Sequence, residues 1–552
     1  FNASLCDAVR FGFSSPPTGQ RDGREILAHL ERANLFLTPL DRRREWYRYH
    51  HLFADLLRYQ LRAQGGEAEE IVLHQRAAHW YEQHGLIDDA LSHHLMAQDS
   101  PAAASLVADH AMPAFRRGEI RSAQKWLEAL PADAIRASPR LCCDMSWICT
   151  VNDDYPRLVE YVNAARAALP GSDWENDAAF MGEWTVLQAF TAFLLGETET
   201  AFSLGQQALD RLPSLPGFVR EVNYILLADI YTSTDIGHVS QAVTCAQEAL
   251  AGGLAGSGLT TSLYAADRLT RALVLQGQYQ AAEAVFQQTF EAVRERGLVY
   301  APILEILYLK YAMTLYELNR TIQAERLIRD GLSLSQKFGA PGSELWCRLL
   351  LRQAQRAQGH AADALDPLAT DEAIDALLRE LAGQAAQHPA IAQFAAFRAQ
   401  LWTVEKRWTH APAVARAEEW ALSSGLSLGD EPSFGQMPFY LALAQVYLAL
   451  GKALPELLTL LEKLHQLASR KGSIQQTVQI LVLQTLTRDK LGQPQAAQAA
   501  LEQALSLTEH TGMTRTFLDH GLPLARLLRQ AEHAYASRLL AAVEPETERA
   551  PV

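Results

Sequence analysis

A double histidine stands out among the residues that could do chemistry. His50 and His51 end the run WYRYHH at residues 46–51, in which aromatic and basic side chains precede the two imidazoles. A neutral imidazole can donate or accept a hydrogen bond, and a protonated imidazole adds a positive charge. The residue types alone leave two roles open, contact with a ligand and simple packing where a strand meets a helix.

The sequence contains no other recognisable catalytic or metal-binding motif. His74, His79 and His84 are five residues apart, so each is turned by about 140° from the last on a helix and they share no face. The sequence has no HExxH or GxSxG motif, and GLAGSGLTT at residues 253–261 lacks the lysine of a phosphate-binding loop. The six cysteines form no CxxC pair and are typical of small, reduced core residues. We therefore expect no catalytic residue, no metal site and no enzymatic activity.

Aromatic residues suggest a ligand pocket instead. Tyr264, Tyr308 and Trp346 fall about one repeat apart, and Arg268 lies one helical turn after the first of them. Apolar platforms with a few converging polar groups suit a small molecule. We predict that Tyr264, Arg268, Tyr308 and Trp346 contact an effector. The alternative is that these rings pack in the core between repeats.

A repeat of about 41 residues must position these side chains. Its unit is an apolar helix, a short turn and a second helix rich in alanine and leucine. The turns carry Gly196, Gly237, Gly277, Asn319, Gly359, Gly451 and Gly492, at intervals of 41, 40, 42, 40, 92 and 41 residues. The long interval places a further turn near residues 406–408. Glycine and asparagine accept the left-handed conformation that ends a helix. The pattern predicts about eight helical hairpins, which is an all-α solenoid of tetratricopeptide type.

The N-terminal part does not share this period. Residues 24–33 and 51–62 have helical patterns, and LFLTPLDRRREWYRYH between them alternates apolar and polar residues as a two-stranded wing would. We predict a small winged-helix segment, followed by a helical connector.

Composition limits the partners. The chain has 552 residues and a net charge of −14, and its basic residues are spread out rather than clustered. Nucleic-acid binding needs clustered cations, so we expect no direct nucleic-acid contact. No apolar run is long enough to span a membrane. We expect a cytoplasmic protein with no membrane contact.

The sequence resembles a known family at both ends. ILAHLERANLFLTPLDRRREWYRYHHLFADLLRYQLR is similar to the winged-helix segment of the MalT-like, LuxR-type ATP-dependent transcriptional regulators, which belong to the STAND class of ATPases. LGQPQAAQAALEQALSLTEHTGMTRTFLDHGLPLARLLR is similar to the end of their sensor. LGDEPSFGQMPFYLALAQ departs from the family, whose members usually have an arginine-bearing helix start there.

This resemblance implies a regulator fragment. In the ATPase superfamily a winged-helix histidine contacts bound ADP, and His50 matches it, so we expect a nucleotide contact there in a full-length protein. ATP or ADP is implied for that protein, and no cofactor for these residues. The implied partners are a small-molecule inducer or an inhibitory protein on the superhelix, the protein's own ATPase and DNA-binding domains, and a second copy through self-association.

The predicted organisation has four parts. Residues 1–65 form the end of an ATPase module with the winged helix, 66–138 a helical connector, 139–515 the superhelical sensor, and 516–552 a tail leading to a DNA-binding domain. The predicted function is the signal-sensing portion of a bacterial transcriptional activator. The alternative is a stand-alone repeat scaffold that binds a protein or peptide.

Overall fold

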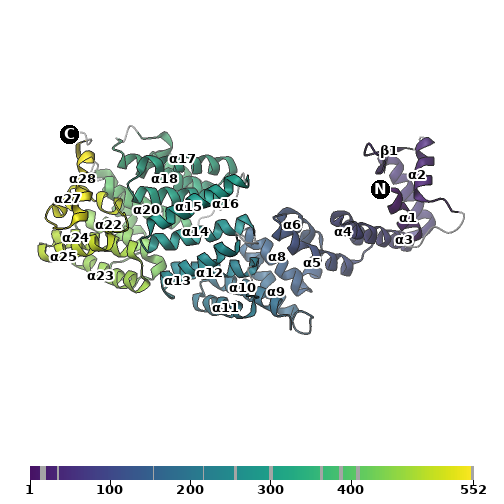
Figure 1. Cartoon of the computed structure of the whole chain (residues 1–552), viewed down its shortest axis with the longest axis horizontal. Coiled ribbons are helices and arrows are strands. Elements are labelled where there is room, and N and C mark those ends of the chain that lie inside the picture. Colours follow the sequence, from purple (N-terminus) through teal and green to yellow (C-terminus); the bar gives the residue numbers. More distant parts are fainter. Residues whose placement is uncertain are drawn as a thin grey trace. The chain divides into compact units, whose positions relative to one another are not determined.

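The computed structural model describes most of the chain. The described residues are 1–12, 20–33, 36–152, 154–214, 217–253, 258–297, 302–360, 365–384, 389–405 and 411–548. Two compact units are present. Unit 1 comprises residues 1–196 and 206–212, and unit 2 comprises residues 197–205 and 213–552. The helices dominate both units (Figure 1).

Unit 1 begins with helices around a short hairpin and continues as a helical array. Its elements are α1 (Ala3–Phe11), α2 (Gly23–Arg32), β1 (Leu37–Pro39), β2 (Tyr47–Tyr49), α3 (His51–Gln83), α4 (Ile87–Met96), α5 (Ser100–Arg116), α6 (Ile120–Ala129), α7 (Ala132–Arg136), α8 (Pro139–Val151), α9 (Tyr155–Ala168) and α10 (Ala178–Leu194). Residues of α11 (Thr198–Arg211) belong to both units.

The predicted wing is confirmed. Strands β1 and β2 pair antiparallel, with Leu37 opposite Tyr49 and Pro39 opposite Tyr47. The carboxylate of Asp41 closes the connection, because it accepts hydrogen bonds from the backbone N–H groups of Glu45 at 3.1 Å and Trp46 at 2.7 Å. These bonds to its charged form lower the pKa of Asp41.

Unit 2 is a run of helical hairpins. Its elements are α12 (Phe218–Ser233), α13 (Val239–Gly252), α14 (Leu259–Leu275), α15 (Tyr279–Glu295), α16 (Pro302–Glu317), α17 (Thr321–Phe338), α18 (Pro341–Ala357), η3 (Pro367–Ala369), α19 (Asp371–Gln384), α20 (Pro389–Glu405), α21 (Ala411–Ser423), η5 (Phe434–Gln436), α22 (Met437–Leu450), α23 (Leu454–Lys471), α24 (Ile474–Lys490), α25 (Pro494–Thr508), α26 (Arg515–Leu518), α27 (Gly521–Leu528) and α28 (Ala534–Glu548).

The repeat predicted from the turns is also confirmed. All seven predicted turn residues have left-handed backbones, with φ between 60° and 87°. An alanine five residues after several of these turns is fully buried, and it lets the second helix lie close to its neighbours; these are Ala201, Ala242, Ala282, Ala324 and Ala497. The turn expected near residues 406–408 lies outside the described residues.

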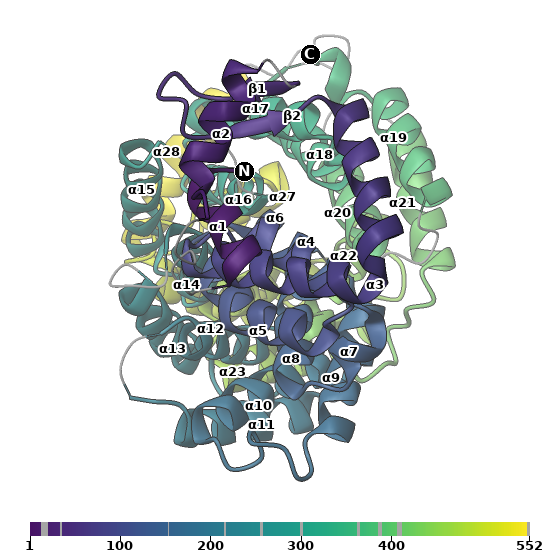
Figure 2. The same cartoon turned by 90° about the vertical axis from the view of Figure 1, so that its right-hand side faces the viewer.

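The hairpins of unit 2 close into a ring. Figure 2 shows them following one another from α13 through α15, α17, α19 and α21 to α23. The last hairpins then meet the first: the N–H of Phe434 donates to Asp235 at 2.7 Å, Nζ of Lys471 donates to the carbonyl of Ile236 at 2.6 Å, and the N–H of Thr514 donates to the carbonyl of Glu317 at 2.9 Å. We call these the ring-closing contacts.

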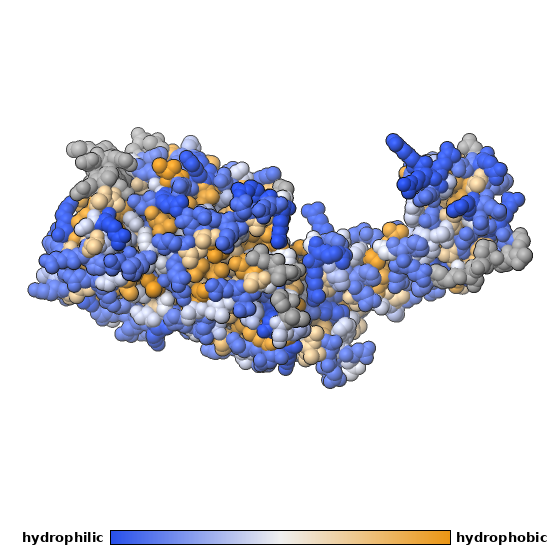
Figure 3. Space-filling model, in the orientation of Figure 1, coloured by the Kyte–Doolittle hydropathy of each residue, from blue (hydrophilic) through white to orange (hydrophobic). Residues whose placement is uncertain are grey.

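The outer faces of the ring meet water. In the view of Figure 3 most of the surface of unit 2 is hydrophilic, with hydrophobic residues in small groups. No described helix combines the length and hydropathy that a membrane-spanning segment requires.

Candidate functional site

The ring of unit 2 encloses a cavity of about 610 Å³. This volume lies in the range of small-molecule sites. The first helices of successive hairpins, α14, α16, α18, α20, α22 and α24, supply most of its wall, and Thr516, Asp519 and His520 also line it. We call it the ring cavity.

Glutamines are frequent in the wall of the ring cavity. They come from α18, α20, α22 and α24: Gln353, Gln393, Gln400, Gln445, Gln475, Gln476 and Gln479. Gln476 is only 8% exposed, and the Oε1 atoms of Gln445 and Gln476 are buried without a hydrogen-bond partner among the described residues. An unpaired buried amide oxygen costs about 1–3 kcal/mol. A ligand with N–H or O–H donors would satisfy these oxygens.

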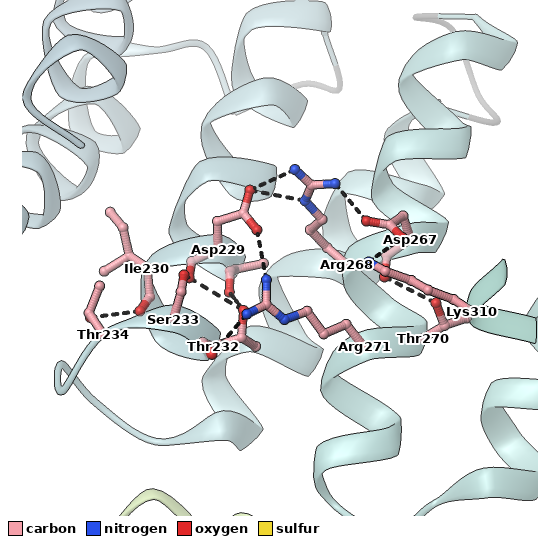
Figure 4. A network of polar contacts seen from close by, with 11 residues as sticks. Asp229, Ile230, Thr232, Ser233, Thr234, Asp267, Arg268, Thr270, Arg271 and Lys310 are labelled. Atoms are coloured by element: carbon pink, nitrogen blue, oxygen red, sulfur yellow. Dashed lines mark hydrogen bonds and ion pairs between the residues drawn. The ribbon is translucent and has the colours of Figure 1, made fainter. Parts of the chain in front are cut away.

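A network of ion pairs forms one side of the cavity wall (Figure 4). Asp267, only 1% exposed, lies 2.6 Å from Nη1 of Arg268 and 2.5 Å from Nζ of Lys310. Burial alone would raise the pKa of Asp267, but the charges of Lys310 and Arg268 outweigh burial and hold that pKa below its ordinary value. Arg268 also donates twice to Asp229, at 2.9 and 2.8 Å. Of the three cations, Lys310 and the more exposed Arg271 line the cavity.

Two carboxylates, those of Glu317 and Asp519, line the cavity. The hydroxyl of Tyr316 donates to both oxygens of Asp519, at 3.1 and 3.0 Å. Arg515 also donates to Asp519, and its guanidinium lies 5.2 Å from the centre of the Tyr316 ring. Glu317 accepts from the backbone N–H of Thr516 at 3.0 Å. Burial raises the pKa of Glu317 to about 7, against the lowering effect of that N–H.

The predicted effector residues fall in different places. Trp346 lines the ring cavity and packs against Phe394 and Phe397. Arg268 lies in the ion-pair network, with its guanidinium 5.9 Å from the ring of Tyr264. Tyr308 packs against Phe290, with ring centroids 4.5 Å apart. Tyr264, Arg268 and Tyr308 are not among the residues that line the cavity. Contact of these four residues with an effector stays a prediction.

Sequence reasoning missed Arg271, Lys310 and the glutamines. Which residues of a repeat helix face the inside depends on how the helix is rotated, and a single sequence does not give that rotation. One signal was present: Gln475, Gln476 and Gln479 lie on one side of helix α24, most of whose residues are buried. Amide side chains in a buried helix need partners, so they indicate a lumen.

The segment that departs from the family pattern also reaches the cavity. Phe434, Gly435, Pro438 and Phe439 line it. Phe434 is held by Lys471, whose Nζ lies 5.0 Å from the ring centroid. The segment around Phe434 is therefore tied both to the cavity and to a ring-closing lysine.

His50 lies at the other site predicted from the sequence, in unit 1. It is the residue before α3, and its carbonyl accepts from the N–H groups of Phe53 and Ala54. Its ring is exposed and lies 4.3 Å from the ring of His51. The side chain does not cap the helix. An exposed imidazole at this junction is accessible to another group, and its nucleotide contact stays a prediction.

Among the histidines of α3 and α4, His74 and His93 form a pair. Nδ1 of His74 and Nδ1 of His93 are 2.8 Å apart, so one ring donates to the other. In the described ranges, no three His, Cys, Asp or Glu side chains come together as a metal site would require.

Comparison with known proteins gives the family. Residues 1–70 match the model of the MalT winged helix domain, and residues 182–534, more than half of the chain, match that of the MalT-like TPR region.

The chain belongs to the MalT-like family.

Curated relatives of this MalT-like chain are transcriptional regulators. It is 26% identical over 539 residues to the HTH-type transcriptional regulator MalT of Vibrio cholerae serotype O1, covering 96% of the chain and 57% of the relative. It is 26% identical over 522 residues to MalT of Serratia proteamaculans, covering 93% and 55%. The chain thus spans about half the length of the curated relatives it matches.

A solved structure supports the MalT-like fold. The chain superposes with a TM-score of 0.52 and 12% identity on PH0952 from Pyrococcus horikoshii, a signal transduction ATPase with a tetratricopeptide repeat sensor, covering 77% of this chain and 60% of that chain. At this identity the likeness concerns the fold alone. The predicted resemblance to MalT-like regulators and the predicted solenoid are confirmed, while the four domain boundaries stay predictions.

Proposed function

We propose that this chain is the sensing portion of a cytoplasmic MalT-like regulator, and that its effector binds in the ring cavity of unit 2. The observation that carries this proposal is the cavity itself, which the repeat helices line and whose wall contains polar groups without a partner among the described residues, such as the buried Oε1 of Gln476. A superhelix that served only as packing would bury apolar side chains at its centre. The full-length regulator would respond by activating transcription.

The relay from the effector starts at the ring-closing contacts. Tyr316, Glu317 and Asp519 line the cavity and also join α16 to the segment after α25. A bound effector touches both sides of this joint and so favours one of its arrangements. It can shift the regulator only by its difference in affinity between active and inactive forms. In the full-length protein, the ATPase would then exchange nucleotide, and His50 would contact the bound ADP in the inactive form.

Partners follow from the same proposal. The ATPase and DNA-binding domains of the full-length regulator, a second copy of the regulator, and an inhibitory protein on the outer surface of the superhelix are the partners we propose. The stand-alone scaffold is less favoured, because the relatives are transcriptional regulators.

A thermal-shift screen tests the proposal. The chain is heated with panels of sugars, aromatic acids, hydrocarbons and short peptides. A ligand at a hundred times its dissociation constant should stabilise the fold by about 2.7 kcal/mol. Gln479→Ala, in the cavity wall, should weaken binding of any hit, while Gln495→Ala on the exposed surface of α25 should leave it unchanged. A hit that binds both variants and the parent equally would place the effector outside the cavity.

A further inference from the structure

The charged side chains that line the ring cavity are separated by sign. Arg271 and Lys310 face it from α14 and α16. Glu317 and Asp519 face it from the end of α16 and from the residue after α26. One helix, α16, thus presents a cation in its middle and a carboxylate at its end.

The cations Arg271 and Lys310 belong to a connected cluster, which we call the positive group, and this group has a net charge of +1. Its connected side chains are the carboxylates of Asp229 and Asp267 and the cations of Arg268, Arg271 and Lys310. Two negative charges face three positive charges, and the excess lies with the two residues that reach the cavity. Arg268 is fully engaged by both carboxylates, whereas Arg271 is held only by a 3.7 Å ion pair and a 3.3 Å bond to the carbonyl of Thr232. A carboxylate in the cavity would complete this group.

In the negative group, formed by Glu317, Asp519 and Arg515, two carboxylates accompany one arginine. Glu317 and Asp519 contribute two carboxylates, and Arg515 bonds to Asp519 and to the side-chain oxygen of Asn319. Burial raises the pKa of Glu317 to about 7, so a positive charge placed beside it would favour its ionised form. An ammonium group in the cavity would supply this charge.

The spacing of the two groups sets the length of the ligand. Lys310 and Glu317 are seven residues apart on one helix, which at 1.5 Å per residue is roughly 10 Å along its axis. An extended peptide advances about 3.3–3.6 Å per residue, so about three residues span this distance. A single amino acid, whose two charged groups sit on one carbon, cannot reach both.

The glutamine side chains of the cavity wall suit peptide bonds. Each glutamine amide offers an acceptor and donors in one plane, as a peptide bond does. The unpaired buried oxygens of Gln445 and Gln476 would accept from backbone N–H groups. Trp346 and Phe397 add apolar surface for side chains.

We propose that the effector of the ring cavity is an extended peptide of about three residues with free ends, its carboxylate at Arg271 and Lys310 and its ammonium group at Glu317 and Asp519. This proposal rests on the proposed function and names the ligand class.

Calorimetry and thermal shift on the whole chain test it with four probes. A tripeptide library with free ends should bind and raise the melting temperature. The same library acetylated at its amine, or amidated at its carboxylate, should bind at least about tenfold more weakly, the loss of about 1.4 kcal/mol expected for one charged contact. The fourth probe, 8-aminooctanoic acid, carries both end charges at a similar distance without amide groups, and it should also bind about tenfold more weakly.

Matched variants assign the ends. Glu317→Gln should bind the free and acetylated libraries equally, and Arg271→Met should bind the free and amidated libraries equally. Glu431→Gln, whose side chain is 83% exposed, is the control and should keep the parent's preferences. Arg271 is more exposed than Glu317, so its variant reports even if Glu317→Gln fails to fold.

Some results would overturn only the peptide assignment, and another would also refute the proposed effector site. Equal binding of free and capped libraries, or binding of aminooctanoic acid as tight as that of the peptides, overturns the peptide assignment. Binding of a neutral ligand whose affinity depends on Gln479 but not on Glu317 or Arg271 would also overturn the peptide assignment. That result would leave the cavity as an effector site. Absence of binding by every probe and by the earlier screening panels would refute both proposals.

Discussion

Glu221 on α12 is a buried carboxylate whose charge no contact among the described residues compensates. Its side chain is 2% exposed, and neither carboxylate oxygen has a hydrogen-bond partner among the described residues. Gly252 lies so close that a methyl group there would come within 2.4 Å of Oε1. Burial raises the pKa of Glu221 from 4.5 to about 7.

This pKa predicts the pH dependence of stability. The folded chain holds the proton of Glu221 more tightly than the unfolded chain does. The protonated side chain therefore adds its full share to the free energy of unfolding below pH 4.5, and this share is lost as the pH rises through about 7. The loss should be on the order of 2–3 kcal/mol. Urea unfolding at pH 5 and pH 8 should show a smaller difference for Glu221→Gln than for the parent. Glu431→Gln should keep the parent's difference; an unchanged pH profile in Glu221→Gln would contradict the prediction.

Asp267 gives a second prediction at this scale. Asp267→Asn leaves Lys310 and Arg268 partly buried without their shared carboxylate, and this should lower the free energy of unfolding by about 2–4 kcal/mol. Adding Lys310→Met should restore part of the loss, since it removes one uncompensated charge. Glu291→Gln, which breaks an exposed pair with Arg294, should cost less than about 1 kcal/mol. Chemical denaturation measures the parent, these three variants and Lys310→Met alone, and a fully additive double variant would show that the pair is not coupled.

At the scale of elements, local rules predicted the hairpins but not the ring. The turns could be found because left-handed residues such as Asn319 and Gly451 end a helix whatever lies around them. The wing could be found because strand alternation is equally local. The ring-closing contacts join residues about 200 positions apart, such as Phe434 and Asp235, and leave no periodic trace in the sequence. Trp346 was found as a cavity residue by its type, and Arg271 was missed because neither type nor spacing marks the inner face.

Ring closure predicts the effect of one methyl group. A Cβ at Gly435 would lie 2.4 Å from the carbonyl oxygen of Ser233 at the end of α12. Gly435→Ala should therefore separate η5 from α12 and lower the free energy of unfolding by about 1–3 kcal/mol. Gly342→Ala, at a position with open space, should not destabilise the chain. Hydrogen exchange should rise at α12 and η5 in Gly435→Ala alone. Parent-like exchange at these elements would mean that the contact adapts without opening.

At the scale of the whole molecule, the two candidate sites lie in different units. The ring cavity belongs to unit 2, and His50 belongs to unit 1. In a regulator, an effector site and a nucleotide contact would be coupled thermodynamically, so a change at one must alter the response at the other. A single sequence predicted the histidine by resemblance and the cavity only in outline, because coupling is a property of the assembled regulator rather than of a motif.

The last prediction tests that coupling through His50. The ring of His50 is exposed, and it makes no capping hydrogen bond to α3. His50→Ala should therefore leave the melting temperature of the chain nearly unchanged. In a full-length regulator it should remove one bond to the phosphates of ADP, worth about 1.5–3 kcal/mol, and shift the balance toward the active form by roughly tenfold or more. Reporter transcription without effector should rise, and the effector concentration for half-maximal response should fall. His51→Ala, the neighbouring exposed imidazole, should change neither quantity. A basal level in His50→Ala equal to that of the parent, at equal protein amount, would assign His50 to packing at the start of α3.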